Sequence, residues 1–108
     1  MKLITAIVRP DIADELALAA TGAGAQGLTA TEVIGFGQQL GHDGPVSSPV
    51  LLPKVRVDIL VHDDDVAAVT EAIAKCANTG TVGDGKVWVS PVESALRVRT
   101  GERDDAAI

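Results

Sequence analysis

The sequence predicts an α+β fold of the ferredoxin-like type, a double βαβ sandwich in which a four-stranded antiparallel sheet carries two helices on one face. Two observations support this prediction. Strand-like and helix-like apolar patterns alternate along the chain, and the order strand, Asp, helix, Gly, strand occurs twice. With 108 residues and 46% hydrophobic side chains, the chain suits one compact domain with its own core, spanning residues 1–108.

The first half begins with the apolar, β-branched stretch KLITAIV, a predicted strand that ends before Pro10. A helix is expected next, with Asp11 as its N-cap and Gly22 or Gly24 as its end. Its apolar positions recur at helical spacing: Ile12, Leu16, Ala19, Ala20 and Ala23. Alternation then returns from Leu28 to Phe36 and predicts the second strand.

The stretch 38–53 holds three prolines, two serines and two glycines, which are too many breakers for a regular element. It is also too long for a tight hairpin, so it is expected to be a flexible loop. Long loops in compact domains are often functional.

The second half opens with the clearest alternation in the chain, KVRVDILVH. A helix capped by Asp63 or Asp64 and stopped by Gly80 is expected to follow. The last strand is KVWVS, ended by Pro91, and 92–108 is expected to form an extended C-terminal tail. Two helices cover only one face of such a sheet. Burial of the other face by self-association is therefore expected.

Composition limits the classes of partner. A net charge of −6 disfavours nucleic acid, and Phe36 and Trp88 are the only aromatic residues on which bases could stack. Neither a signal peptide nor a membrane span is recognisable, and Cys76 is the only cysteine. A cytoplasmic protein without membrane insertion is the expectation.

Positive charge nevertheless gathers late in the chain, in two glycine-flanked clusters. In GTVGDGK, Gly83 and Gly85 permit positive φ and let backbone N–H groups converge on an anion, to which Lys86 adds a charge. Arg97 and Arg99 are two positions apart, so an extended segment would direct both guanidinium groups to one side as a phosphate clamp. The alternatives are a hairpin turn for the first cluster and a solvated edge for the second.

The stretches QGLTATEVIGFG, LPKVRVDILV, TGTVGDGKVWVSPVE and RVRTGER together resemble the PII signal-transduction proteins of nitrogen regulation over nearly the whole chain. The resemblance implies a homotrimer that binds ATP and ADP in clefts between subunits and contacts a target protein through the long loop, the T-loop, at 38–53. It also makes 79–86 the nucleotide-binding loop. The implied nucleotide-binding residues are Ile7, Thr29, Gly35, Gly37, Gln38, Asp58, Leu60, Gly83, Gly85, Lys86, Arg97 and Arg99.

The same resemblance implies that Gln39 ligates Mg²⁺ together with ATP phosphates, and that Gln39 and Lys54 bind 2-oxoglutarate. A neutral amide oxygen suits a hard cation that phosphates already neutralise. The sequence departs from the family at Gln38, where arginine is usual, and at Asp58, where glutamate is usual. The T-loop is about four residues shorter than usual and has no tyrosine, so tyrosine modification is excluded.

Two other functions stay open. One is a divergent PII-like sensor of ADP or AMP and another small anion, such as bicarbonate, that regulates a transporter. The other is an enzyme, with HDDD at 62–65 as a metal site for phosphate hydrolysis. Consecutive side chains at a strand–helix junction diverge, however, and favour a structural role for these aspartates. The sequence therefore favours a sensor over an enzyme.

Overall fold

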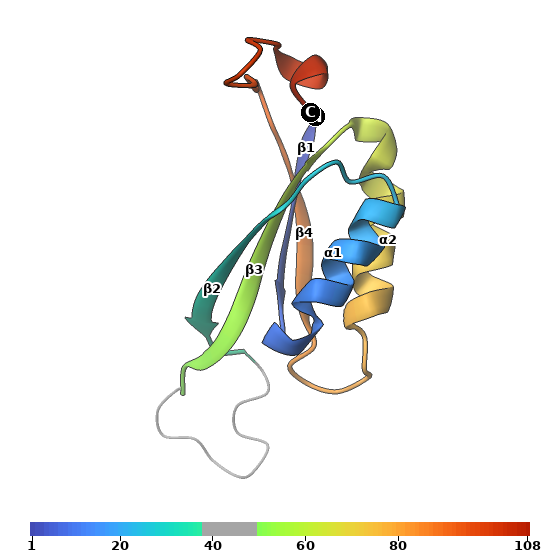
Figure 1. The fold of residues 1–108 in the computed structure, drawn as a ribbon. Coiled ribbons are helices and arrows are strands. Elements are labelled where there is room, and N and C mark those ends of the chain that lie inside the picture. Colours follow the sequence, from blue (N-terminus) through green and yellow to red (C-terminus); the bar gives the residue numbers. More distant parts are fainter. Residues whose placement is uncertain (38–49) are drawn as a thin grey trace.

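The computed structural model describes residues 1–37 and 50–108, and its fold confirms the predicted one. Four antiparallel strands form one sheet in the order β2-β3-β1-β4, and two helices pack on one of its faces (Figure 1). The strands are β1 (Lys2–Val8), β2 (Thr29–Gly35), β3 (Leu52–Val61) and β4 (Gly85–Pro91), and the helices are α1 (Ala13–Gly22) and α2 (Val66–Ala77). The two predicted βαβ halves are β1-α1-β2 and β3-α2-β4.

The core lies between the helices and the sheet. Every second residue of β1 and β3 points into it, and the register places Ile4 opposite Ile59 and Ala6 opposite Val57. The largest fully buried apolar side chains are Ile4, Leu16, Ile59, Ile73, Val8, Val57, Val61 and Val69. Since burial of one such side chain contributes roughly 1.5–3 kcal/mol, this layer explains why the strand and helix patterns of the sequence were reliable.

The predicted aspartate caps are wrong. Asp11 lies inside a short 3-10 turn, Pro10–Ile12, and Asp63 and Asp64 lie inside another, Asp63–Asp65. No side-chain hydrogen bond caps either turn or either helix. Instead, a 3-10 turn precedes each helix. Its hydrogen bonds between residues three apart use some of the backbone N–H groups that a capping side chain would otherwise accept.

Asp63 has a different role at the start of β1. Its Oδ1 accepts hydrogen bonds from the N-terminal ammonium of Met1 and from Lys2 Nζ, each at 2.9 Å. These hydrogen bonds, from the N-terminal ammonium first and then from Lys2, lower the pKa of Asp63 to about 2 from an ordinary value of 3.8. The carboxylate therefore fastens the first strand to the turn before α2.

This ion pair predicts an acid-dependent loss of stability. Because the folded-state pKa of Asp63 is depressed, its contribution is complete above about pH 4 and is lost as the pH falls towards about 2. Asp63→Asn should flatten that part of the pH profile. Urea unfolding between about pH 6 and about pH 2 measures it, with Asp64→Asn as the control. Equal acid dependence of wild type and Asp63→Asn would contradict the assignment.

Two boundaries differ from the prediction. β3 begins at Leu52, so the regular strand starts two residues inside the predicted 38–53 loop. The C-terminal segment is not extended, because an isolated bridge joins Leu96 to Arg103 around a turn and a short 3-10 helix, Asp104–Ala107, follows. The turn closes where Gly101, at φ +75°, donates its N–H to the carbonyl of Arg97 at 2.8 Å.

No helix in the described ranges is long and apolar enough to cross a membrane.

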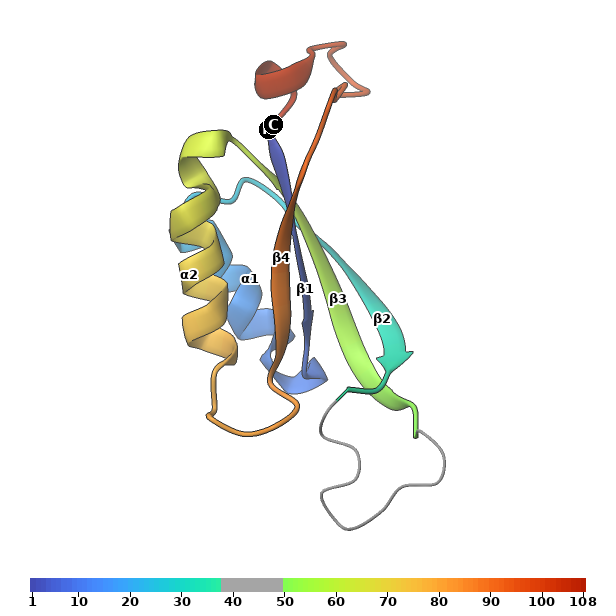
Figure 2. The same ribbon diagram turned by 180° about the vertical axis from the view of Figure 1, so that it is seen from behind.

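The sheet face that the helices leave open is visible in Figure 2, which shows the fold from behind. The register places Thr5 between Asp58 and Trp88 on this face. Thr5 is nearly inaccessible, and its hydroxyl donates to Asp58 Oδ1 at 2.8 Å. The open face is thus a mixture of polar and apolar side chains, not the apolar surface that the sequence suggested.

Candidate anion-binding site

A cleft of about 590 Å³ opens at the end of the sheet where β1 and β2 finish and β3 and β4 begin. Its lining residues come from all four strands or their ends and from the loop 79–86, whose last two residues begin β4. Seven of the residues predicted from the sequence line it: Ile7, Gly35, Gly37, Lys54, Gly83, Gly85 and Lys86. Five further lining residues were not among the predicted site residues: Phe36, Thr81, Val82, Asp84 and Trp88.

The two glycines of the loop adopt the conformation that the sequence suggested. Gly83 has φ +102° and Gly85 has φ +111°, values that side chains rarely allow. A Cβ atom on Gly85 would also overlap the carbonyl oxygen of Ile7, on the adjacent strand β1. The glycines therefore bring the loop backbone close to the sheet and leave no side chain between the backbone and the cleft.

The cleft carries two lysines, one on β3 and one on β4, the two strands that flank β1. Lys54, near the start of β3, donates to the carbonyl of Gly83 at 3.2 Å. Lys86, opposite Ile7 in the β1–β4 register, is exposed and makes no ion pair with any described residue. Together with the glycine-rich backbone, these ammonium groups form a pocket suited to an anion.

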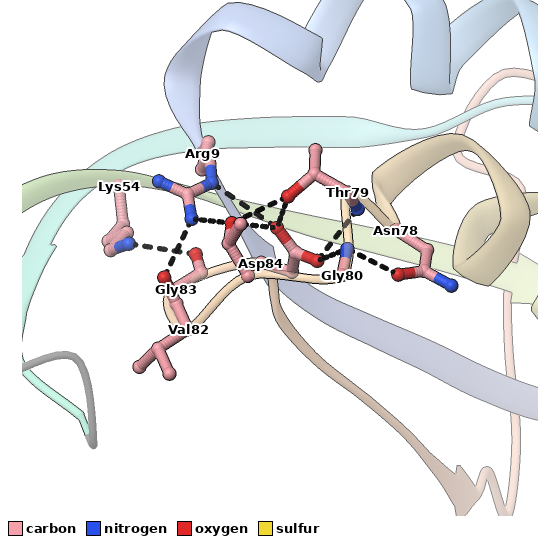
Figure 3. A network of polar contacts seen from close by, with 9 residues as sticks. Arg9, Lys54, Asn78, Thr79, Gly80, Val82, Gly83 and Asp84 are labelled. Carbon is pink, nitrogen blue, oxygen red and sulfur yellow. Dashed lines mark hydrogen bonds and ion pairs between the residues drawn. The ribbon is translucent and has the colours of Figure 1, made fainter.

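Asp84 folds the loop onto itself, as Figure 3 shows. Its Oδ2 accepts the backbone N–H of Thr79 at 2.7 Å and that of Gly80 at 3.0 Å, and its Oδ1 accepts the hydroxyl of Thr79. The hydrogen bond from the Thr79 hydroxyl is the main cause that lowers the pKa of Asp84 to about 2. The carboxylate is thus an ionised part of the loop at neutral pH.

Arg9, at the end of β1, extends across the loop from the other side (Figure 3). Its Nη2 donates to the carbonyl of Val82 at 2.8 Å and to Thr81 Oγ1 at 3.1 Å, and its Nε lies 3.4 Å from Asp84 Oδ1. An aspartate between two glycines is a signal that could have indicated the folded turn. Nothing local in the sequence connects Arg9 to it, because more than 70 residues separate them.

Three predicted residues lie outside the cleft, farther along the sheet. Thr29, Asp58 and Leu60 belong to β2 and β3, and the register pairs Thr29 with Asp58. Burial disfavours ionisation of Asp58, but hydrogen bonds from Arg56 Nε at 3.0 Å and from Thr5 outweigh it and lower its pKa. Asp58 is therefore an ionised acceptor on the open face.

Arg97 and Arg99 lie at the opposite end of the sheet from the cleft, beyond the end of β4 (Figure 1). The predicted side-by-side clamp is wrong, because the turn that Gly101 closes places Arg99 within a bend and not in an extended segment. Arg97 donates to Glu102 Oε1 at 3.0 Å and to the carbonyl of Ile108 at 2.8 Å, whereas Arg99 is exposed. One chain does not bring these arginines to Lys86.

Gln38 and Gln39 lie outside the described residues, and the Mg²⁺ ligand and the 2-oxoglutarate site stay predictions. Among residues 1–37 and 50–108, no group of three or more His, Cys, Asp or Glu side chains is placed to hold a metal ion. Within HDDD, Asp63 is engaged by Met1 and Lys2, as described above.

Comparison with known proteins is consistent with this arrangement. The family model described as nitrogen regulatory protein P-II matches residues 1–102. Nitrogen regulatory protein GlnK of Escherichia coli (strain K12) is 43% identical, and nitrogen regulatory protein P-II of Cereibacter sphaeroides is 46% identical, both over the full length of each chain. Nitrogen regulatory protein P-II 2 of Methanothermobacter thermautotrophicus is 45% identical over the whole chain and 97% of its own length. The alignments span 112 positions, four more than this chain has residues.

Proposed function

The chain belongs to the P-II family of nitrogen regulatory proteins, a family of signal-transduction regulators and not of enzymes, and from this premise we propose that it is a trimeric sensor of adenine nucleotides. It binds ATP or ADP in clefts between subunits, senses 2-oxoglutarate together with Mg-ATP, and regulates a target protein of nitrogen or carbon metabolism, or a transporter, through the T-loop.

One observation carries the nucleotide assignment. Two positive-φ glycines and two lysines from different strands meet in one cleft, and Lys86 has no counter-ion among the described residues. This chemistry suits a polyphosphate: a close loop backbone with no obstructing side chain at the two glycines, and positive charge from two lysines. The apolar surfaces of Ile7, Phe36 and Trp88 give the same cleft a wall for a less polar part of the ligand.

The distribution of the remaining predicted residues supports binding between copies of the chain. Arg97 and Arg99 lie beyond a strand of seven residues, about 20 Å long, from the glycine loop. A single chain cannot close its cleft with them. A second copy packed against the open face supplies them to its neighbour's cleft, and the trimer that we propose contains three such arrangements.

We assign the 2-oxoglutarate carboxylate to Lys54, whose ammonium group lies beside the loop and can exchange its bond to Gly83 for a ligand. Gln39 would hold Mg²⁺ together with the nucleotide phosphates. When bound, Mg²⁺ supplies a positive charge that lets phosphates and a dicarboxylate occupy one cleft.

Isothermal titration calorimetry tests the proposal. The purified protein is titrated with ATP, ADP and AMP, each with Mg²⁺ and with or without 2-oxoglutarate. We expect ATP and ADP to bind, and 2-oxoglutarate to bind only when Mg-ATP is present. Binding of ADP or AMP without any response to 2-oxoglutarate would favour the second candidate, a sensor of another small anion such as bicarbonate that regulates a transporter. Absence of heat with all three nucleotides would refute both.

A further inference from the structure

Arg9 makes three contacts with the loop 79–86, and each is to a different residue. It donates to the carbonyl of Val82, to the hydroxyl of Thr81 and to the carboxylate of Asp84. The backbone of Arg9 is extended and Pro10 follows it, so the start of this side chain is fixed by the end of β1 and the 3-10 turn after it. The guanidinium group thus links the loop to the rigid sheet.

Gly83 provides the space in which Arg9 lies. A Cβ atom at this position would lie 2.9 Å from Arg9 Nη2, closer than real Cβ atoms approach, and 3.3 Å from its Cζ, a tight contact, so Arg9 would have to shift. The missing side chain therefore serves two purposes: it permits the positive φ of the loop, and it leaves room for the guanidinium group to reach its hydrogen-bond partners in the loop (Figure 3).

Asp84 is an anion that the loop itself supplies. It takes up the N–H groups of Thr79 and Gly80, so these donors are not available to a ligand. Its negative charge is also two residues from Lys86, in the wall of the cleft, where it would repel a phosphate. Arg9 is the cation that faces this carboxylate, and it offsets the repulsion.

We propose that Arg9 is a positioning residue of the anion site: it fixes the loop 79–86 to the end of β1 and neutralises Asp84, which leaves the charge of Lys86 and Lys54 for the ligand. The nucleotide part of this inference rests on the proposed function, whereas the fixing of the loop does not. Arg9 acts through Asp84, and the two side chains form one unit.

The first test measures the loop without any nucleotide. Arg9→Met removes the charge and keeps a flexible apolar stem, and Lys75→Met, at an exposed position of α2, removes one positive charge elsewhere. We expect Arg9→Met to accelerate amide hydrogen exchange at Thr79 and Gly80 by about tenfold, because their acceptor loses its partner. Lys75→Met should leave both rates unchanged. Unchanged exchange in Arg9→Met would overturn the fixing role.

The second test measures ATP affinity by calorimetry in a double-variant cycle. Arg9→Met should weaken ATP binding by roughly fivefold to tenfold, since an uncompensated carboxylate is left beside the phosphates. Asp84→Asn removes the charge and keeps one oxygen that can accept hydrogen bonds from the N–H groups of Thr79 and Gly80. The variant with both Arg9→Met and Asp84→Asn should therefore bind ATP more tightly than Arg9→Met alone.

The outcomes separate the two proposals. A double variant that binds ATP more weakly than Arg9→Met would overturn charge neutralisation, because purely structural damage accumulates. If the wild-type protein binds no ATP, the proposed function fails, and the amide exchange rates still decide whether Arg9 fixes the loop. Far-ultraviolet circular dichroism equal to that of the wild type is the control that each variant is folded.

Discussion

Replacing Gly85 with alanine is expected to lower the free energy of unfolding by about 3 kcal/mol, the sum of backbone strain and a direct clash. Gly85 has φ +111°, which costs a residue with a Cβ atom free energy before any contact is considered. That Cβ atom would overlap the carbonyl oxygen of Ile7, which belongs to the backbone of the central strand β1 and cannot rotate away. β1 and β4 would have to separate at the start of their pairing.

Urea unfolding at one fixed protein concentration measures this loss, because self-association would make the midpoint concentration-dependent. Gly22→Ala is the matched control. Gly22 ends α1 without a positive φ, and no atom lies within 4 Å of the position that its Cβ would occupy. The control should be neutral or up to about 1 kcal/mol more stable. If Gly85→Ala unfolds at the same urea concentration as the control, the close approach of the loop to β1 is wrong.

The same contrast explains which parts of the fold could be predicted. Strands and helices follow from burial, and burial repeats with a period that one chain displays. The alternation of Val55, Val57, Ile59 and Val61 is the clearest pattern in the sequence, and all four side chains lie in the core. Ends of elements depend instead on single hydrogen bonds. Asp11 and Asp63 are of a residue type that often caps helices, but here a 3-10 turn precedes each helix and no side-chain cap forms.

The residues of the candidate site also separate into those that the sequence could predict and those that it could not. Gly83, Gly85 and Lys86 were predictable because their conformations and charges are properties of a short segment. Arg9 was not, because its contribution arises only when β1 and β4 pair and bring the two ends together. Arg97 and Arg99 show the opposite error. The spacing argument for a clamp assumed an extended chain, and the turn at Gly101 removes that assumption.

The charges at the cleft differ from what the net charge of the chain suggests. A net charge of −6 describes the whole chain, whereas the ligand would meet only the end of the sheet. There, Asp84 is paired with Arg9 and hydrogen-bonded within the loop, and Lys86 carries no described counter-ion. The field at the cleft is set by which charges remain unpaired, and an acidic protein can therefore present a cationic site.

Lys86→Met is accordingly expected to weaken ATP and ADP binding by tenfold or more, because one charge-assisted hydrogen bond contributes on the order of 1.5–3 kcal/mol. Stability should not change. Lys86 is exposed and makes no ion pair with a described residue, so its loss leaves no buried group without a partner. Methionine keeps the length and apolar character of the side chain, so β4 retains its pairing with β1.

Calorimetric titration at two salt concentrations separates charge from shape. Added salt screens an ammonium–phosphate attraction, so wild-type affinity should fall with salt more steeply than that of Lys86→Met. Lys75→Met loses the same charge from an exposed position on α2 and should match the wild type in affinity and in salt dependence. If Lys86→Met binds ATP as tightly as Lys75→Met, the phosphates lie elsewhere. The unpaired lysine would then be only a solvated charge at the edge of the cleft.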